Sequence, residues 1–323
     1  MKFGRSLHIL SSVAILFCLI FLSAAPLPRD PSMAEAASFS YPIEVFETYP
    51  KGESATARTN EIVTFGFPFK RGELSSVNPL RVKGAATAQF RQTAEWPDGS
   101  VKWALIDFLL PNLGNNAIDS SYAVESGGSG NIGGSNICSG GSGTITANTG
   151  AGGIRAVIKQ NNFNVFDSVE LEDGTSLVVS GNPGGVAFID EGGGIHLSNS
   201  GSASRFEIRE NGPTRCQVVA EGMIGGSNVG YRVIYDFLKE KSRVNLAVSL
   251  KNALFNSPTH KAFRGAGLLI DTEIEGDNIT ANIASQSGGA TSFPLGSNES
   301  VVITNWYSSA HDTENEGNLG FDT

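Results

Sequence analysis

The sequence predicts an all-β protein, and three observations support that prediction. Glycine contributes 39 of the 323 residues, and glycine weakens helices while it serves turns and bulges. Short runs that alternate apolar and polar residues recur between turn sequences, as half-buried strands do. No stretch of a dozen residues follows a helical period. At about 150 residues per domain, the length favours two β domains.

The charge balance excludes one broad class of function. The chain has 32 acidic and 23 basic side chains, which gives a formal net charge of −9. Neutralising nucleic-acid phosphates requires a basic surface, so we expect no nucleic-acid partner. Beyond the N-terminal segment, His196, His260 and His311 lie far apart, and no C-x-x-C pair occurs. We therefore expect no multi-histidine or zinc centre and no required cofactor.

Residues 1–37 have the features of a cleaved secretory signal peptide. Lys2 and Arg5 precede the apolar run 13–22, and small residues ending in Ala34-Glu35-Ala36-Ala37 follow, as at an A-x-A cleavage site. The apolar run is shorter than the roughly 20 residues that span a membrane. We expect a secreted or extracytoplasmic protein with no membrane partner after cleavage. An uncleaved N-terminal anchor is the alternative.

Residues 39–124 are expected to form a compact first β unit. Its strand-like runs are rich in β-branched and aromatic residues, and they lie at 42–47, 61–67 and 101–110. The turn sequence Trp96-Pro97-Asp98-Gly99 reverses the chain immediately before the last of these runs.

The run 101–110 predicts a central strand. Val101, Trp103 and Leu105 alternate on one face, and the opposite face is also mostly apolar. A strand that is apolar on both faces belongs inside its sheet or barrel. We therefore expect Val101 and Trp103 to fill the core.

Residues 125–143 mark the predicted domain boundary. From Ser126 to Gly143 the sequence SGGSGNIGGSNICSGGSG has almost no charge and no hydrophobic period. Glycine and serine at this density behave as an unconstrained coil, which predicts a linker or a long mobile loop.

Residues 144–323 return to a β pattern. Short alternating runs between 153 and 250 are separated by turns such as Asn182-Pro183-Gly184-Gly185. Many short strands at this spacing predict an antiparallel β-sandwich, which we expect to be incomplete at its C-terminus. Cys138 and Cys216 lie in a chain expected to reach an oxidising compartment, and one disulfide or two independent thiols fit the sequence equally well.

Three motifs of the first β unit occur together in a specific order. They are residues 49–55 (YPKGESA), residues 64–74 (TFGFPFKRGEL), and Gln89-x-Arg91 followed by the run Trp96-Pro97-Asp98-Gly99-Ser100-x-Lys102-Trp103. This combination resembles the N-terminal RIFT-type barrel of exo-rhamnogalacturonan lyase-like and YetA-like proteins. The resemblance implies that residues 39–124 form a small RIFT-type β-barrel.

The second block is similar to the β-sandwich that follows the barrel in those proteins. The matching segments are 146–157 and 208–222, and the resemblance covers most of residues 40–255. It implies a larger helical domain downstream that carries or completes the active site. The chain shows no such pattern before Thr323, so we expect either a fragment or a protein that kept only the accessory domains.

The resemblance also implies the chemistry of a polysaccharide lyase. Such an enzyme abstracts the proton next to a uronate carboxylate, which requires a base and a positive group or metal that stabilises the developing charge. An arginine pair beside an exposed turn could hold the sugar carboxylate. The weak candidates for substrate binding are Arg91, Trp96, Asp98 and Lys102, with the ring of Trp103 beside them, and Arg209 and Arg215 around the turn at 211–213.

Each of these candidates also has a structural interpretation, which we favour. Asp98 and Gly99 make the turn, and Lys102 pairs locally with Asp98 or Glu95. Arg209 and Arg215 would form cross-strand ion pairs of small energetic value. The catalytic residues are therefore left unassigned.

Asp312, Glu314 and Glu316 occupy positions one, three and five of a loop with Gly317 at position six, as at the start of a calcium loop. Thr323 stands where the bidentate glutamate belongs. A solvated acidic tail is therefore favoured over a calcium site.

Three functions follow from these observations. The first is an accessory, polysaccharide-directed N-terminal part of a secreted rhamnogalacturonan-lyase-like protein, without a complete active site and with a pectic polysaccharide as partner. The second is a polysaccharide lyase or hydrolase whose cleft lies between the two domains. The third is a non-enzymatic surface or structural β module, for which the Gly/Ser segment and the low charge are equally suitable.

Overall fold

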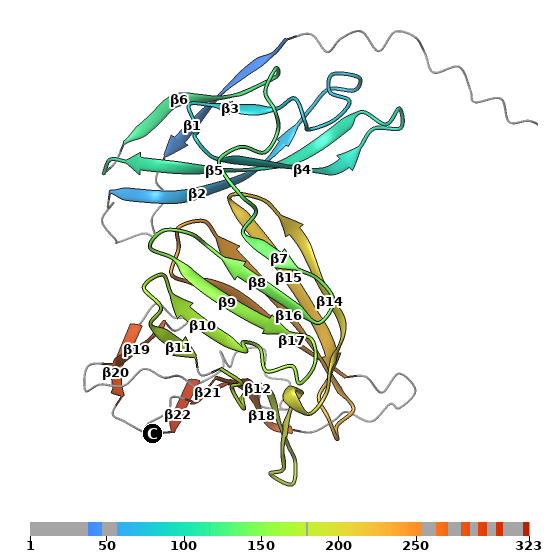
Figure 1. The fold of residues 1–323 in the computed structure, drawn as a ribbon, viewed down its shortest axis with the longest axis vertical. Helices are drawn as coiled ribbons and strands as arrows, with labels where there is room; N and C mark the ends of the chain where they lie inside the picture. The colour runs from blue at the N-terminus through green and yellow to red at the C-terminus, as the bar shows by residue number, and fades with distance from the viewer. Residues whose placement is uncertain are drawn as a thin grey trace, which may run out of the picture.

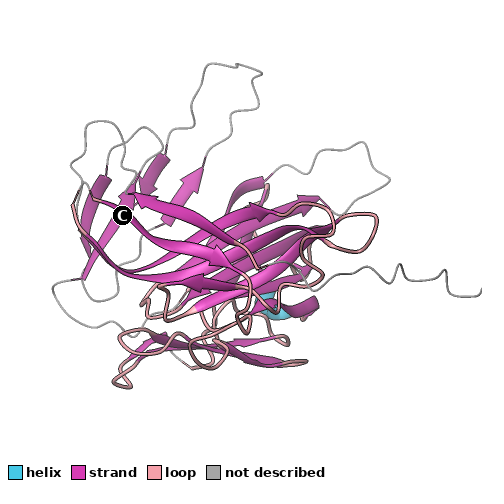
Figure 2. Ribbon diagram, turned by 90° about the horizontal axis from the view of Figure 1, so that it is seen from above, coloured by secondary structure: helices cyan, strands magenta, loops and turns pink. Residues whose placement is uncertain are grey.

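The fold of the described residues is almost entirely β. The computed structural model describes residues 38–46, 57–115, 117–178, 180–252, 263–270, 279–284, 290–295, 302–305 and 319–322. Within these ranges the one helical segment is a 3₁₀ turn, η1 (Ser198–Ser200), and Figure 2 shows strands throughout the rest of the body. The prediction of an all-β protein is confirmed. The signal segment 1–37 and the calcium candidates Asp312, Glu314 and Glu316 lie outside the described residues.

The first domain is a small barrel made of two three-stranded antiparallel sheets (Figure 1). Its strands are β1 (Ser40–Phe46), β2 (Arg58–Pro68), β3 (Arg81–Lys83), β4 (Ala88–Glu95), β5 (Val101–Leu113) and β6 (Ile118–Glu125). One sheet has the order β1-β6-β3 and the other β2-β5-β4. Leu80, Ile106 and Phe108 are fully buried between them. Strand β5 is central in its sheet, as its apolar sequence predicts.

Strand β5 does not bury the face that simple alternation predicts. Ile106 and Phe108 lie in the core, whereas Trp103 is 42% exposed. The pairing of β5 with β4 shifts register on both sides of Ala94, and such bulges increase the local twist and redirect side chains. Val101, on the other side of this irregularity, is buried. The prediction that Trp103 fills the core is wrong, because the barrel interior takes the face of Ala104, Ile106 and Phe108, whereas Trp103 lies on the outer face of the sheet.

The glycine-rich segment 126–143 is held by both domains: its first part lies against the barrel, and its last part, from Ile137, belongs to the sandwich. Gly128 N donates a hydrogen bond to Pro79 O at 2.7 Å, and Ile132 forms an antiparallel bridge to strand β4. A β-carbon on Gly128 would lie 2.5 Å from Leu80 O, so glycine permits the backbone to approach this closely. The prediction of an unconstrained linker or mobile loop is wrong, because these glycines serve close packing.

The second domain is a β-sandwich. Its first sheet has the order β11-β10-β9-β8-β7 and its second the order β14-β15-β16-β17. The strands are β7 (Cys138–Gly140), β8 (Thr144–Asn148), β9 (Ile154–Lys159), β10 (Ser168–Leu171), β11 (Ser176–Val178), β14 (Ala203–Asn211), β15 (Arg215–Met223), β16 (Val229–Leu238) and β17 (Val244–Asn252). Both sheets contribute to one core around Phe163, Tyr231 and Tyr235, where Phe163 stacks on Tyr231 at 4.9 Å between ring centroids.

A disulfide crosses this core. Cys138 of β7 and Cys216 of β15 are bonded, with their Cα atoms 6.0 Å apart, and both residues are buried. The bond joins the two sheets of the sandwich. Of the two alternatives that the sequence left open, the structure contains the disulfide.

Three smaller sheets lie at the end of the sandwich away from the barrel (Figure 1). Their orders are β13-β12-β18, β19-β20 and β21-β22. The strands are β12 (Gly185–Asp190), β13 (Ile195–Leu197), β18 (Phe263–Leu269), β19 (Ile279–Ala284), β20 (Ala290–Leu295), β21 (Val302–Asn305) and β22 (Leu319–Asp322). Among the described residues, no helix has the length and apolar character needed to cross a membrane.

Candidate functional site

The barrel and the sandwich meet at a buried polar contact, which we call the domain junction. Sheet β2-β5-β4 lies on the side of the barrel that faces the sandwich (Figure 1). Gln89 of β4 is at the centre of the junction. Its Oε1 accepts hydrogen bonds from Thr214 N at 3.3 Å, Thr214 Oγ1 at 3.0 Å and Arg215 N at 3.0 Å, and its Nε2 donates to Glu210 Oε1 at 3.3 Å. Gln89, Glu210 and Thr214 are all buried.

The turn between β14 and β15 is shaped to receive Gln89. A β-carbon on Gly212 would lie 2.2 Å from Gln89 Cδ, so no larger residue fits there without displacement. On the other side of the turn, Asn211 exchanges hydrogen bonds with the backbone of Cys138 at 3.0 and 2.9 Å. Ile137 N donates to Gly212 O at 3.0 Å. One turn therefore holds both the barrel strand β4 and the start of β7.

Asp107 of β5 adds a buried carboxylate to the junction. It is 0% exposed and accepts a hydrogen bond from Thr64 Oγ1, and its Oδ2 has no hydrogen-bond partner among the described residues. Burial raises the pKa of Asp107 to about 6, and the nearby Glu210 carboxylate acts in the same direction, while Thr64, Arg215 and Arg91 oppose the shift. The junction therefore contains a carboxyl group that titrates just below neutral pH.

Two arginines balance the acidic groups of the junction. Arg91 Nε lies 3.4 Å from Glu210 Oε2. Arg215 contacts Asp236 through Nε at 3.0 Å and Nη2 at 2.7 Å, and its Nη1 lies 4.0 Å from Asp107 Oδ1. The structure thus brings two sequence-predicted candidates, Arg91 and Arg215, to one place, where both are engaged with carboxylates.

A second contact between the domains lies away from Gln89. Lys241, in the turn between β16 and β17, places Nζ 3.2 Å from Glu61 Oε1 of β2. The Lys241 side chain is mostly buried. The barrel is therefore attached to the sandwich at two separate points of its β2-β5-β4 sheet.

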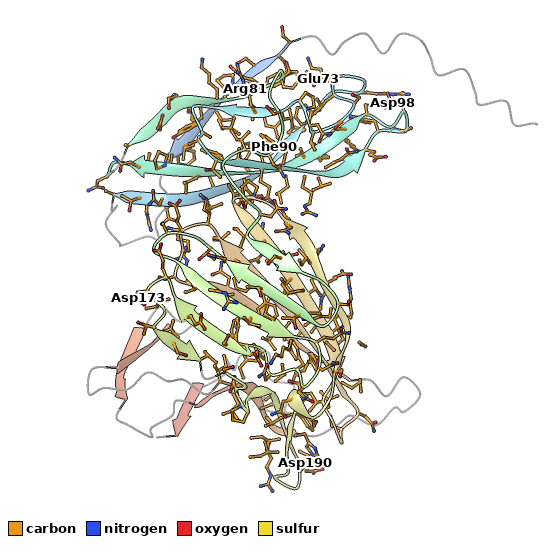
Figure 3. The ribbon with its side chains drawn as sticks, viewed as in Figure 1. Glu73, Arg81, Phe90, Asp98, Asp173 and Asp190 are labelled. Carbon is orange, nitrogen blue, oxygen red and sulfur yellow. A yellow bond between two sulfur atoms is a disulfide. The ribbon has the colours of Figure 1, made fainter. Side chains whose placement is uncertain are left out.

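Asp98 is fully occupied by the turn that it helps to form. Its Oδ1 accepts from Ser100 N at 3.0 Å and from Ser100 Oγ at 2.6 Å, and Arg71 Nε donates to its Oδ2 at 2.8 Å. These bonds from Ser100 and then Arg71 lower the pKa of Asp98 to about 2. Asp98 lies at the tip of the β4–β5 hairpin, at the edge of the barrel (Figure 3). It is a turn residue that stays ionised.

Trp96 and Lys102 form a local pair beside that turn. Lys102 Nζ lies 4.7 Å from the centroid of the Trp96 ring, a cation–π contact. The indole Nε1 of Trp96 donates to Phe69 O at 3.0 Å. Lys102 therefore pairs with an aromatic ring instead of Asp98 or Glu95, and one face of Trp96 is covered.

Trp103 and Arg209 are both exposed, and neither takes part in the domain junction or in the turn at Asp98. Arg209 lies on β14 and forms no ion pair with any described carboxylate, whereas Arg215 forms a cross-strand ion pair with Asp236 of β16. No group of three histidine, cysteine, aspartate or glutamate residues is placed to hold a metal ion in the part of the chain that the structure describes.

A small barrel docked on a disulfide-linked sandwich defines a two-domain β protein with a RIFT-type barrel. Residues 52–110, which include β2, β3, β4 and most of β5, match the PcRGLX-like N-terminal RIFT barrel domain family. The resemblance of the first domain to the barrel of rhamnogalacturonan lyase-like proteins is therefore confirmed over these residues. No curated protein matches the chain with significant similarity.

Sequence reasoning missed the acidic side of the junction. Asp107 lies in an apolar run, where it interrupts the pattern of a strand at one position. Aspartate is rarely buried without a partner, so an aspartate in a central strand predicts a buried polar contact. Glu210 stands next to the turn at 211–213, and nothing in its local sequence distinguishes it from a surface carboxylate. Gln89 belongs to a motif of the family resemblance, but its contact with Glu210 spans 121 residues, so no local pattern predicts it.

Proposed function

We propose that this chain is an accessory, polysaccharide-directed part of a secreted rhamnogalacturonan-lyase-like protein, and that its described domains hold no complete active site. One observation carries the proposal. Three residues of the motifs that resemble lyase-like proteins are used for architecture: Gln89 and Arg91 bind the sandwich, and Asp98 closes a hairpin turn. The proposed partner is a pectic polysaccharide, and the proposed role requires no cofactor.

The chemistry of elimination supports this division of roles. A lyase must present a base and a positive group to the same uronate, with both held near the reacting carbon. At the junction the candidate base, Asp107, is fully buried, and Arg215 is paired with Asp236. Each of these groups is held by a neighbour of its own domain, Asp107 by Thr64 and Arg215 by Asp236, at a contact that the two domains bury.

The experiment compares binding with turnover. The mature chain is expected to be retarded in affinity electrophoresis through a gel that contains pectic polysaccharide. The same preparation is expected to release no unsaturated uronate, which is followed by its ultraviolet absorbance. Retardation without product supports the accessory role. Absence of retardation contradicts the polysaccharide-directed role and favours the structural module.

A second candidate function is a lyase or hydrolase with its cleft at the domain junction. The observation in its favour is the pair of buried carboxyls, Asp107 and Glu210, one of which has a pKa raised to about 6, in the range useful to a general acid or base. Product formation that disappears in folded Asp107→Asn and Glu210→Gln variants would establish this function. A domain opening that exposes the junction would be required, and faster proteolysis in the presence of substrate would detect it.

A further inference from the structure

The outer face of sheet β2-β5-β4 continues beyond the domain junction into solvent. Directly paired residues share a face of a sheet, so this face can be followed in cross-strand rows. The first row is Thr64, Asp107 and Gln89, the second is Gly66, Leu105 and Arg91, and the third is Pro68, Trp103 and Ala94. On β5 the side chains change from fully buried at Asp107 to 42% exposed at Trp103. The sandwich therefore covers Asp107 and Gln89 of the first row and leaves Trp103 of the third open.

The indole of Trp103 lies over the backbone of the neighbouring strand. A β-carbon on Gly66 would meet Trp103 Cε3 at 3.7 Å and Cζ3 at 3.8 Å, which is ordinary van der Waals contact. Gly66 has no side chain, so the ring reaches across it and rests against β2. The indole packs against β2 on one side and is still 42% exposed, so it presents an apolar surface to solvent.

Hydrogen-bonding groups border this ring. Arg91, in the adjacent row, has 38% of its side chain exposed while its Nε is held 3.4 Å from Glu210. An arginine has five N–H donors in a planar fork, so this single contact leaves donors for a carboxylate. Thr93 is exposed beside Trp103 and donates from Oγ1 to Trp103 O at 3.2 Å. The exposed indole face, with the Arg91 donors and the Thr93 hydroxyl oxygen near its edge, is suited to a sugar ring, whose C–H face is apolar and whose rim is polar.

The other tryptophan of the shared motif lacks this arrangement. Trp96 has Lys102 over one face of its ring and its Nε1 bonded to Phe69 O, so that face and its hydrogen-bond donor are both used. The other exposed large apolar side chains of the described residues are aliphatic or belong to Phe46. Phe46 pairs with Ile118 at the end of the β1–β6 ladder, where no charged side chain lies in the same row.

We propose that Trp103, with Arg91 beside it, is a subsite for an acidic sugar of a polysaccharide chain. The pyranose ring stacks on the exposed indole face, and the carboxylate of the same or the adjacent sugar accepts hydrogen bonds from Arg91. This inference rests on the proposed polysaccharide-directed function and assigns it a surface. No bond is made or broken, so the subsite serves binding and orientation alone.

The test uses the whole mature chain and three variants. Trp103→Ala removes the ring, Trp103→Phe keeps a smaller one, and Met223→Ala is the control, because Met223 is 43% exposed on the far domain. Affinity electrophoresis against de-esterified pectin and against a neutral galactan measures binding. We expect Trp103→Ala to lose about tenfold or more in affinity for pectin, Trp103→Phe to fall in between, and Met223→Ala to match the unaltered chain.

Tryptophan fluorescence distinguishes direct contact between pectin and Trp103 from a loss of binding caused by a structural change in the variant. The chain has three tryptophans, and the difference in emission between the unaltered chain and Trp103→Phe isolates the signal of Trp103. Pectin is expected to protect this signal from acrylamide quenching. Arg91→Lys keeps the charge and loses the fork, so it is expected to weaken binding to pectin while binding to galactan is unchanged.

The outcomes distinguish this inference from the function on which it rests. If the unaltered chain binds neither polymer, the proposed function fails and the subsite fails with it. If the chain binds pectin and Trp103→Ala binds as tightly as Met223→Ala, the proposed function stands and the subsite is wrong. If Trp103→Ala instead abolishes self-association in sedimentation experiments, the ring is a contact between copies of the chain, which also overturns the subsite.

Discussion

Gly212 and Gln89 are so close that a β-carbon on the glycine would lie 2.2 Å from the side-chain carbonyl carbon of the glutamine. This contact joins two domains at residues more than a hundred positions apart in sequence. It explains why a glycine stands in the β14–β15 turn and why the glutamine is buried. The interface is therefore sensitive to a single methyl group.

Gly212→Ala is expected to loosen the domain junction. The added methyl group must displace Gln89, which breaks its hydrogen bonds to Thr214 and Glu210, and overpacking of this kind costs about 1–3 kcal/mol. Urea denaturation followed by tryptophan emission measures the loss. Gly141→Ala is the control, because a β-carbon there meets nothing within 4 Å. Equal stability of the two variants would contradict the role assigned to this contact.

The pH dependence of stability is expected to carry the signature of Asp107. Its pKa of about 6 lies above its ordinary value of 3.8, so the folded protein binds this proton at a higher pH than the unfolded chain does. The contribution of this group to the free energy of unfolding therefore rises as the pH falls from 7 towards 4.5, by about 3 kcal/mol at most.

Asp107→Asn is expected to flatten the stability profile in this window. Asp98, whose pKa is lowered to about 2, acts at lower pH, since its contribution is lost only as the pH falls below about 4. Denaturation curves between pH 4.5 and 7.5 measure both proteins. A variant that keeps the slope of the unaltered chain would show that another group titrates there.

Trp103→Ala is expected to leave the stability of the barrel nearly unchanged. The ring is 42% exposed, so its removal opens no internal cavity. Phe108→Ala, which empties a fully buried position on the same strand, is expected to cost about 3–5 kcal/mol. Thermal unfolding of the two variants makes the comparison. A cost for Trp103→Ala similar to that for Phe108→Ala would place the tryptophan in the core after all.

The segment 126–143 is expected to resist proteolysis. Its backbone bonds to Pro79, Leu80 and Ala88 must break before a protease can bind an extended stretch of it. Limited digestion with a protease of broad specificity, read by mass spectrometry, is expected to leave this segment intact in the native protein. Rapid cleavage within it would show that these bonds open readily in solution.

Loss of the disulfide is expected to destabilise the sandwich. Cys138 and Cys216 are 78 positions apart, and a bond that closes a loop of this length stabilises a domain by about 2–4 kcal/mol. The double replacement of both cysteines by alanine, compared with the unaltered chain under oxidising conditions, measures the difference. Reduction of the unaltered chain should produce the same shift, whereas the double variant should not respond to reductant.

Much of the fold could be predicted from the sequence because strands and turns leave local signals. The strand at 101–110, the turn at Asp98 and the sandwich strands follow from alternation and turn chemistry, and the barrel follows from its motifs. The position of Trp103 could not be predicted, since both faces of the run 101–110 are largely apolar and the sequence does not show which face points into the barrel. The role of Gly128 could not be predicted either, because glycine in a packed segment and glycine in a coil look alike in sequence.

The candidate site was predictable only in part. Arg91 and Arg215 were recognised as candidates from their residue type and their neighbours, and the structure brings them to the same junction. Their partners could not be inferred, because Asp107, Glu210 and Asp236 reach them through tertiary contacts. The exposure of Trp103 depends on where the sandwich ends on the barrel sheet, which is a property of domain packing and not of any local run.

The two attachments of the barrel have a mechanical consequence. A single point of contact would act as a swivel, about which the barrel could rotate. The Lys241–Glu61 ion pair lies away from the Gln89 turn and blocks that rotation. The chain also enters the sandwich at Cys138, which is bound to the same turn through Asn211 and to β15 through the disulfide. A force applied to a polymer bound at Trp103 would therefore be transmitted to the sandwich core through both contacts. The orientation of the barrel relative to the sandwich would be kept.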